Sequence, residues 1–372
     1  MALNVKEITD QAGMRDFLNL PARIYNEDPL WVPPVTSEIC RTLDHRINPY
    51  FHHASRRLFI CYRGKEPVAR TAVVINKKHW DQQQRKSAMF GFFESVDDTD
   101  ACRILFERVE HYCNRKGIEC LEGPFNPNHY SELGLLTRNF TDPPLFFETY
   151  NPEYYKSLLK HAGFHAVHSL HTRINRDIAN YVQGRYDLSK LPVCMNGFKI
   201  RQFQLWNYRR DLENIRQINN DAFSDNWHFL PLSRDEYRFA GKYMFLVTAP
   251  HLVIIVEHND EPVGVIQLTL NINNILRSLN GNAGIGDSLG FFWRRRQLKE
   301  IVIYAIGIKK AYQHSPVFML ILDSMCRILA RYSVLSTTWM TDTNMAAIRA
   351  SERLGLEPYK WFHIYEKKIK TC

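Results

Sequence analysis

The sequence predicts an α/β protein made of two tandem units, each with a mixed central sheet flanked by helices. The first observation is a repeat. Leu58–Ala72 reads LFICYRGKEPVARTA and Leu252–Gln267 reads LVIIVEHNDEPVGVIQ, so that Glu66-Pro67-Val68 lies 195 residues before Glu261-Pro262-Val263. The second is that flanking patterns recur at nearly the same offset, which a hairpin repeated by chance would not show. The third is the alternation of strand-like and helix-like segments along each unit.

The same order of elements is expected in both units. In the first unit the expected strands are 4–8, 58–62, 68–75, 87–93, 118–122 and 165–174, and the expected helices are 15–26, 99–116 and 151–163. In the second unit the expected strands are 199–203, 252–257, 263–270, 301–308, 333–340 and 362–367, and the expected helices are 210–222, 316–331 and 344–355. These assignments rest on β-branched and aromatic runs, apolar residues at helical spacing, and Gly or Pro at the breaks.

The chain has 372 residues, enough for two cores of about 180 residues each. We expect an N-terminal domain over residues 1–190 and a C-terminal domain over 191–372. The polar stretch 176–197, with Gly184, Pro192 and Gly197, is expected to connect them.

Composition is that of a packed globular protein, with 45% hydrophobic residues. No apolar run reaches the roughly 20 residues of a membrane span, and the N-terminus has no apolar signal-like segment, so we expect a cytoplasmic protein. The eight cysteines include no CxxC pair, which favours reduced, buried thiols and predicts no metal site.

The net charge of +9 is held mainly after Lys190, where 23 basic residues face 16 acidic ones. The excess gathers at Arg294-Arg295-Arg296 and at Lys299, Lys309 and Lys310. A phosphorylated cofactor, an anionic membrane surface and nucleic acid all fit such a cluster, and a solvated face without a partner is an equally ordinary explanation. Because no nucleic-acid motif accompanies the charge, no specific nucleic acid is expected.

The expected strand 301–308 is followed by Lys309-Lys310-Ala311-Tyr312-Gln313-His314-Ser315-Pro316-Val317 and then by a helix. This order resembles the GNAT superfamily of acyl-CoA N-acyltransferases, in which backbone N–H groups of such a loop and the following helix N-terminus bind the pyrophosphate of coenzyme A. Successive backbone donors beside a helix dipole do form an anion site. The resemblance implies acetyl-CoA or a longer acyl-CoA as donor, bound by Ile308, Gln313, His314, Ser315 and Val317.

The match is partial, because Gln313 fits the first position of the family's motif whereas Pro316 stands where its first glycine would be. Proline removes one N–H donor. The segment Asn344–Leu356 follows the family's later helix more closely, and Asn344 is expected either to contact the pantetheine arm or to cap the helix. Ser351 stands where many members carry a tyrosine acid, so a tyrosine acid at that position is excluded.

The corresponding loop of the first unit, Glu94–Asp100, has four acidic residues and no glycine. Carboxylates repel a pyrophosphate, so the first unit is not expected to bind coenzyme A.

Five short motifs resemble a narrower bacterial tandem-GNAT group, the YghO-like proteins. They are PLWVPP (29–34), NPYF (48–51), GFFE (91–94), EGPFNP (122–127) and NPEYY (151–155). This resemblance covers nearly the whole chain, and it points to enzymes that N-acylate lipid amines such as sphingoid bases. FemABX-like peptidyltransferases share the tandem architecture but use aminoacyl-tRNA.

Amide formation needs a deprotonated amine and donors for the oxyanion. The candidate bases are Glu300, Tyr304 and His228. Each residue also has a purely structural explanation. Glu300 can be a surface partner of the arginines, Tyr304 a core aromatic, and His228 an ordinary loop residue. Trp227 and Phe229, with Phe291–Trp293, are expected near the substrate, or are ordinary core aromatics.

The leading hypothesis is acyl transfer from an acyl-CoA to a small-molecule or lipid-like amine, with peripheral membrane contact through Arg294–Arg296. The alternative is a catalytically inactive GNAT-like ligand-binding module, which Pro316, Ser351 and the acidic loop of the first unit favour.

Overall fold

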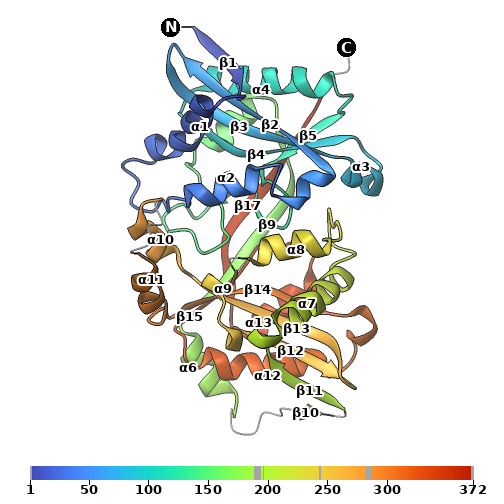
Figure 1. The fold of residues 1–372 in the computed structure, drawn as a ribbon. Helices are drawn as coiled ribbons and strands as arrows, with labels where there is room; N and C mark the ends of the chain where they lie inside the picture. Colours follow the sequence, from blue (N-terminus) through green and yellow to red (C-terminus); the bar gives the residue numbers. More distant parts are fainter. Residues whose placement is uncertain (1, 188–193, 196, 243, 282–286, 370–372) are drawn as a thin grey trace. The chain divides into compact units, whose positions relative to one another are not determined.

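The structure, a computed structural model, describes residues 2–187, 194–195, 197–242, 244–281 and 287–369. It divides into two compact units (Figure 1). The first unit comprises Met1–His171, Leu276–Gly284 and Lys360–Cys372, and the second comprises Thr172–Ile275 and Ile285–Tyr359. The units are therefore not two consecutive halves of the chain.

The first unit is built on a sheet with the strand order β1-β2-β3-β4-β5-β17. Its strands are β1 (Leu3–Glu7), β2 (Ala54–Arg63), β3 (Glu66–Asn76), β4 (Ser87–Ser95), β5 (Cys120–Gly123) and the part of β17 (Glu357–Lys368) from Lys360 onward. Neighbours are antiparallel except β4 and β5, which run parallel. The short strand β8 (Leu135–Arg138) also pairs with β17.

Helices cover both faces of this sheet. On one face, α1 (Gln11–Ile24) and α2 (Thr36–Leu43) bury Phe17 and Leu43 against Leu58 and Ala72. On the other, α4 (Thr99–Asn114) and α5 (Tyr155–His161) form a larger core around Phe59. Successive strand residues such as Leu58 and Phe59 point to opposite faces, so both sides of the strand are apolar.

The second unit has a sheet with the strand order β9-β15-β14-β13-β12-β11-β10. Its strands are the end of β9 (His165–Asn175), β15 (Val334–Thr337), β14 (Glu300–Ile308), β13 (Glu261–Leu270), β12 (Val253–His258), β11 (Phe198–Gln202) and β10 (Cys194–Met195). Among the described strands of this sheet, β14 and β15 run parallel to each other, and the other neighbouring pairs from β9 to β10 are antiparallel.

Two helices lie on opposite faces of the second sheet. Val265 of β13 packs with Ile215 and Ile218 of α7 (Tyr208–Ala222). The next residue back, Gly264, faces the other way, where an added Cβ would meet Val317 of α12 (Val317–Leu329) at 2.4 Å. Three further helices of this unit are α6 (Ile178–Arg185), α8 (Arg234–Gly241) and α13 (Met345–Arg353).

The two central hairpins share an irregularity at the same repeat position. The β2–β3 register shifts between Cys61 and Tyr62, and the β12–β13 register shifts between Val256 and Glu257, 195 residues later. The expected strands and helices occur in the expected order, but the structure adds helices that were not predicted, among them α2, α6 and α8. The predicted fold class, two tandem domains with mixed sheets flanked by helices, is confirmed.

The last strands of the two sequence repeats are exchanged between the units. The end of β9 pairs with β15, through Ile174 and Asn175, and so completes the second sheet. The end of β17 pairs with β5, through Tyr365–Lys368, and completes the first. The predicted boundary at residue 190 therefore describes where one sequence repeat ends and the next begins. The boundaries of the compact units differ from it, because the last strand of each repeat belongs partly to the other unit. Part of the expected connector 176–197 forms α6 within the second unit, and 188–193 and 196 lie outside the described residues.

Candidate functional site

The candidate site lies where β14 and β15 of the second unit separate. These parallel strands pair only from Glu300↔Val334 to Ile303↔Thr337. On its other edge β14 stays paired with β13 up to Ile308, but the register shifts between Gln267 and Leu268, whose Cα partners are Ala305 and Ile303, so that the register passes over Tyr304. Tyr304 is thus a β-bulge at the point of separation, and beyond it no described strand pairs with that edge of β14. Bulges re-aim side chains and are common next to active sites.

A polar cluster lies on the α7 face of the sheet beside this bulge. The amide nitrogen of Asn219 donates to the hydroxyl of Tyr237 at 3.1 Å and to the side-chain carbonyl of Gln267 at 2.9 Å. Gln267 is the direct partner of Ala305 across the ladder. The Oδ1 atom of Asn219 is buried and accepts no hydrogen bond from the described part of the chain. It is aimed at the strand, since a Cβ added at Gly307 would lie 2.7 Å from it.

The tyrosines of this region stay protonated at neutral pH. Burial raises the pKa of Tyr304 above its usual value. Burial, and then the proximity of Tyr304, raises the pKa of Tyr237. A phenol with a raised pKa is a poor base but a competent hydrogen-bond donor. Tyr304 is therefore better suited to donating a proton or a hydrogen bond than to accepting a proton.

The loop after β14 is hydrogen-bonded to the last turn of α7 and to the turn that follows it. The carboxylate of Asp221 accepts from the backbone N–H of Lys310 at 2.6 Å, and Asp225 accepts from its ammonium group at 2.7 Å. Tyr312 is held on the other side, with its hydroxyl 3.4 Å from Nδ1 of His258, which stacks on Phe198. The loop is therefore a fixed connection from β14 into α12.

Several loop amides already have acceptors within the protein. Those of Tyr312, Gln313 and Ser315 donate to backbone carbonyls, and that of Lys310 donates to Asp221. The first helical hydrogen bond of α12 runs from Leu320 N–H to Pro316 O at 3.0 Å, and the helix has no side-chain N-cap. The amides of Phe318 and Met319 precede that bond and point out of the helix end. An anion here would be bound by the first turn of α12 rather than by the loop.

The matching end of α4 in the first unit carries its own anion. Asp98 accepts from the backbone N–H of Ala101 at 3.0 Å and pairs with Arg63. The gap between β4 and β5 is also filled, because the Asn126 side chain accepts from the N–H of Phe92 at 2.6 Å. A Cβ added at Gly91 would lie 1.6 Å from the carbonyl oxygen of Phe125. The first unit thus has its own carboxylate and its own chain at these two places, and the absence of coenzyme A binding there stays a prediction.

The three candidate bases lie in different places. Tyr304 is at the bulge. Glu300 is at the start of β14, where it accepts from Asn271 at 2.7 Å. Glu300 lies four positions before Tyr304 on this strand, which corresponds to about 13 Å. His228 lies in the turn after α7 with a φ of 53°, and the nearby pair Asp225–Lys310 brings this turn to the loop.

The two predicted substrate contacts share that turn. The Trp227 ring lies edge-on to His228 at 3.8 Å between ring centroids. Phe229 is buried, and its N–H closes the turn on the carbonyl of Asn226 at 3.0 Å.

The predicted cofactor contacts between residues 308 and 317 lie in one continuous segment, from the end of β14 to the start of α12, but not all of their side chains are exposed. Ile308 ends β14, and Gln313 and His314 are exposed on the loop. The hydroxyl of Ser315 donates to Tyr312 O at 2.5 Å and accepts from Val317 N–H at 3.4 Å. The side chain of Val317 is buried beneath Gly264, so only its backbone remains available.

Asn344 caps α13, since its side chain accepts from the N–H of Ala347 at 3.1 Å. The hydroxyl of Ser351 donates to the carbonyl of Ile348 at 2.6 Å and is buried. The capping alternative for Asn344 is thus what the structure shows, and Ser351 is used inside its own helix.

Sequence reasoning missed Asn219, Tyr237 and Gln267. One indication was present, because Gln267 is a polar residue within the otherwise apolar run Val263–Leu268. The proximity of Asn219 and Tyr237 depends on how α7 and α8 pack on the sheet, which no local pattern encodes.

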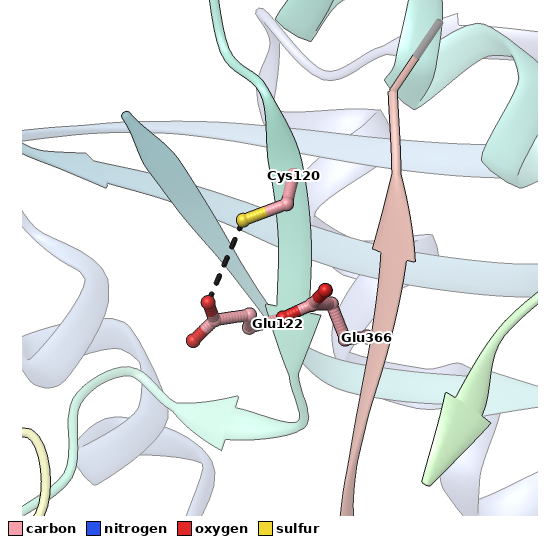
Figure 2. Close-up of side chains that lie close together, drawn as sticks. All are labelled: Cys120, Glu122 and Glu366. Atoms are coloured by element: carbon pink, nitrogen blue, oxygen red, sulfur yellow. Dashed lines mark hydrogen bonds between the residues drawn. The ribbon is translucent and has the colours of Figure 1, made fainter. Parts of the chain in front are cut away.

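One cluster in the first unit has the composition of a metal site. Cys120, Glu122 and Glu366 offer ligand atoms within 4.8 Å of one another, and Figure 2 shows them converging from β5 and β17. The guanidinium of Arg85 contacts Glu122 at 3.3 Å and Glu366 at 2.7 Å. Arg85 therefore supplies the positive charge that two facing buried carboxylates need, and the cluster is explained without a metal.

No helix among the described residues is both long and apolar enough to cross a membrane. The basic run Arg294–Arg296 spans the end of α11 (Asp287–Arg295) and the residue after it, next to the exposed Phe292 and Trp293.

Comparison with known proteins agrees with this fold. A bacterial ceramide synthase from Caulobacter vibrioides is 28% identical over 379 residues, covering 99% of this chain and 98% of its own. Protein YghO from Escherichia coli K12 is 24% identical over 380 residues, covering 98% and 95%. No family model matches the chain.

Two solved structures show the same architecture. A tandem GNAT protein from the clavulanic acid biosynthesis pathway matches with a TM-score of 0.58 at 11% identity, covering 99% of both chains. A GCN5-related N-acetyltransferase from Sphaerobacter thermophilus matches with a TM-score of 0.52 at 11% identity, covering 99% of this chain and 96% of the other. The chain is a tandem GNAT-fold protein that resembles the YghO-like group over its whole length.

Proposed function

We propose that the protein transfers an acyl group from an acyl-CoA to the amine of a long-chain, lipid-like acceptor, using the second unit. The main support is the contrast between two equivalent helix ends within one chain. At the N-terminus of α12 the N-cap residue Pro316 gives no side-chain hydrogen bond, and the neutral Ser315 hydroxyl contacts only the N–H of Val317, whereas the N-terminus of α4 is occupied by the carboxylate of Asp98. A phosphate group fits the first and is repelled at the second.

The donor would lie along the separated edge of β14 with its phosphates at α12. The amides of Phe318 and Met319 are available for the pyrophosphate, and Gln313 and His314 lie on the loop before them. Lys309 and Lys310 add positive charge, although Glu261 and Asp225 partly neutralise them. The acyl-CoA supplies the activated thioester. Whether the acyl chain is acetyl or longer is decided by the experiment described below.

The acceptor amine would be held by the polar cluster at the bulge. The unsatisfied Oδ1 of Asn219 is an acceptor ready for an amine N–H, and filling it removes the cost of a buried unpaired polar atom. A lipid-like acceptor is supported by the similarity to a bacterial ceramide synthase, whose name implies amide formation on a sphingoid amine.

In the reaction the amine nitrogen bonds to the thioester carbonyl carbon, the carbon–sulfur bond breaks, and coenzyme A leaves as the thiol. The amine loses one proton and the sulfur gains one. Tyr304, protonated because its burial raises its pKa, is proposed to donate to the leaving sulfur. His228 is the proposed acceptor of the amine proton, because a ring nitrogen of a neutral imidazole can act as a general base.

An inactive ligand-binding module is the second candidate. It is favoured by the loop amides that already donate within the protein, by Pro316, which has no N–H, and by the internal hydrogen bond of Ser351.

Calorimetry with acetyl-CoA and palmitoyl-CoA, followed by mass spectrometry of the product formed with a long-chain amino alcohol, separates the two. Saturable acyl-CoA binding with amide product supports the enzyme, and binding of neither donor supports the module. Tyr304→Phe should lower kcat by about 100-fold while leaving donor affinity unchanged. Tyr208→Phe is the matched control, since it keeps the ring that packs on Phe203 and removes a hydroxyl that donates to the carbonyl of Gly241. Equal rates for the two variants would remove Tyr304 from the mechanism.

A further inference from the structure

The segment between β11 and α7, whose two flanking elements are labelled in Figure 1, carries two large apolar side chains that are exposed to solvent. Trp206 is 85% exposed and Leu205 is 60% exposed, within a 3-10 turn of three residues. A lone exposed apolar residue is ordinary, but an adjacent leucine and tryptophan with this exposure typify an interaction surface.

This exposure is fixed by the surrounding structure. The backbone N–H of Gln204 donates to Asp211 at 2.9 Å, and Asn207 N–H closes the turn on Gln204 O at 3.0 Å. Asp211 is fully buried and pairs with the guanidinium of Arg201 at 2.7 and 2.8 Å. The turn is therefore anchored to the buried ion pair of Asp211 and Arg201, which holds Leu205 and Trp206 in their exposed positions.

The charge around the turn has one sign at the surface. Arg209 and Arg210 follow one turn later and are exposed. Within 204–211 the only acidic residue is Asp211, which Arg201 neutralises in the interior. An apolar tip beside uncompensated arginines is complementary to an anionic bilayer, where the ring of tryptophan favours the interface and arginine favours the headgroups.

We propose that the 3-10 turn Leu205–Asn207, with Arg209 and Arg210, docks the protein on an anionic lipid membrane. Leu205 and Trp206 enter the headgroup region, and the two arginines contact lipid phosphates. The docking is independent of acyl transfer, because it needs neither acyl-CoA nor the β14 bulge. It also assigns the membrane contact to a different surface from Arg294–Arg296 on α11.

The test is co-sedimentation of the full chain with vesicles of phosphatidylcholine alone and with 30% phosphatidylglycerol, without acyl-CoA. The wild type should bind the anionic vesicles and bind the neutral ones much less. The double variant L205S/W206S should lose binding at least tenfold. The double variant R209Q/R210Q should lose affinity for the anionic vesicles by about fivefold for each arginine removed, and its binding to the neutral vesicles should not change.

The matched control is F292S/W293S on α11, which removes an exposed pair of similar size. Phe292 is 42% and Trp293 64% exposed. Binding retained by this control and lost by L205S/W206S, with unchanged melting temperatures, supports the proposal. Loss by the α11 variant alone overturns it, as does equal binding of L205S/W206S and wild type. A dimer in sedimentation velocity that L205S/W206S dissolves would also overturn it, because the turn would then contact a second copy of the chain.

Discussion

The side-chain oxygen of Asn126 accepts a hydrogen bond from the backbone N–H of Phe92 at 2.6 Å, and so fills the gap between β4 and β5 with the protein's own chain. The carbonyl of the preceding residue, Phe125, lies against Gly91. In the second unit the corresponding separation of β14 from β15 leaves one edge of β14 without a described strand partner. The two repeats thus share a framework but differ in whether the separated strands are filled.

A negative charge at the start of α12 should weaken acyl-CoA binding. Met319 is exposed in the first helical turn, so Met319→Glu places there a carboxylate comparable to Asp98 of α4. Repulsion of the pyrophosphate should raise the Kd at least about tenfold, whereas the helix itself is not destabilised, because acidic residues suit a helix N-terminus. Isothermal titration calorimetry measures the effect. Thr99→Glu in the first turn of α4 is the control, and an equal loss for both variants would contradict the placement of the donor site.

Gly91→Ala should destabilise the first unit strongly, by about 3 kcal/mol or more, because the new methyl group meets the carbonyl of Phe125. The control is Gly184→Ala in α6, where a Cβ meets no atom within 4 Å. Alanine is the better helix former, so this variant should be neutral or more stable by up to about 1 kcal/mol. Urea unfolding followed by circular dichroism compares them, and similar midpoints would mean that Phe125 does not fill the gap.

Removal of Arg85 should leave Glu122 and Glu366 without the guanidinium that contacts both. We expect Arg85→Met to cost up to about 3 kcal/mol, because a buried ionic group has lost its partner. The double variant R85M/E366Q, which removes one of the two negative charges, should recover much of the loss. Thermal melting measures this, and an equal loss for R85M and R85M/E366Q would point to packing. Dialysis against EDTA should not change the wild-type melting temperature, and a clear fall would instead indicate a metal at Cys120.

Glu213 should contribute to stability in a defined pH window. Arg216, and then Gln217 and Arg234, lower the pKa of Glu213 to about 2 from its usual 4.5. Since the folded-state pKa lies below the unfolded-state value, the contribution is present above pH 4.5 and is lost as the pH falls toward 2. Glu213→Gln should therefore cost about 1 kcal/mol at pH 7, and this cost should shrink as the pH falls from 4.5 toward 2. Denaturant titrations at a series of pH values measure this, and a constant difference would contradict the assignment.

Much of the fold could be read from local patterns. The hairpins around Gly64 and Asn259 follow from turn residues between β-branched runs, and α4 follows from apolar residues at helical spacing between Asp98 and Gly117. Because of the repeat at 195 residues, an element assigned in one unit also predicts an element at the equivalent position of the other unit. The candidate loop was also found from sequence, since a strand, a basic loop and a helix succeed one another along the chain.

The sequence by itself determined the elements, their repetition and the position of the candidate anion site, because these depend on residues close together in the chain. Tertiary structure alone decided three things: the exchange of β9 and β17, the filling of the first unit by Phe125 and Asn126, and the meeting of Asn219, Tyr237 and Gln267 beside Tyr304. Each depends on residues tens to hundreds of positions apart, and on packing that selects one pairing among several that local propensity leaves equally favourable.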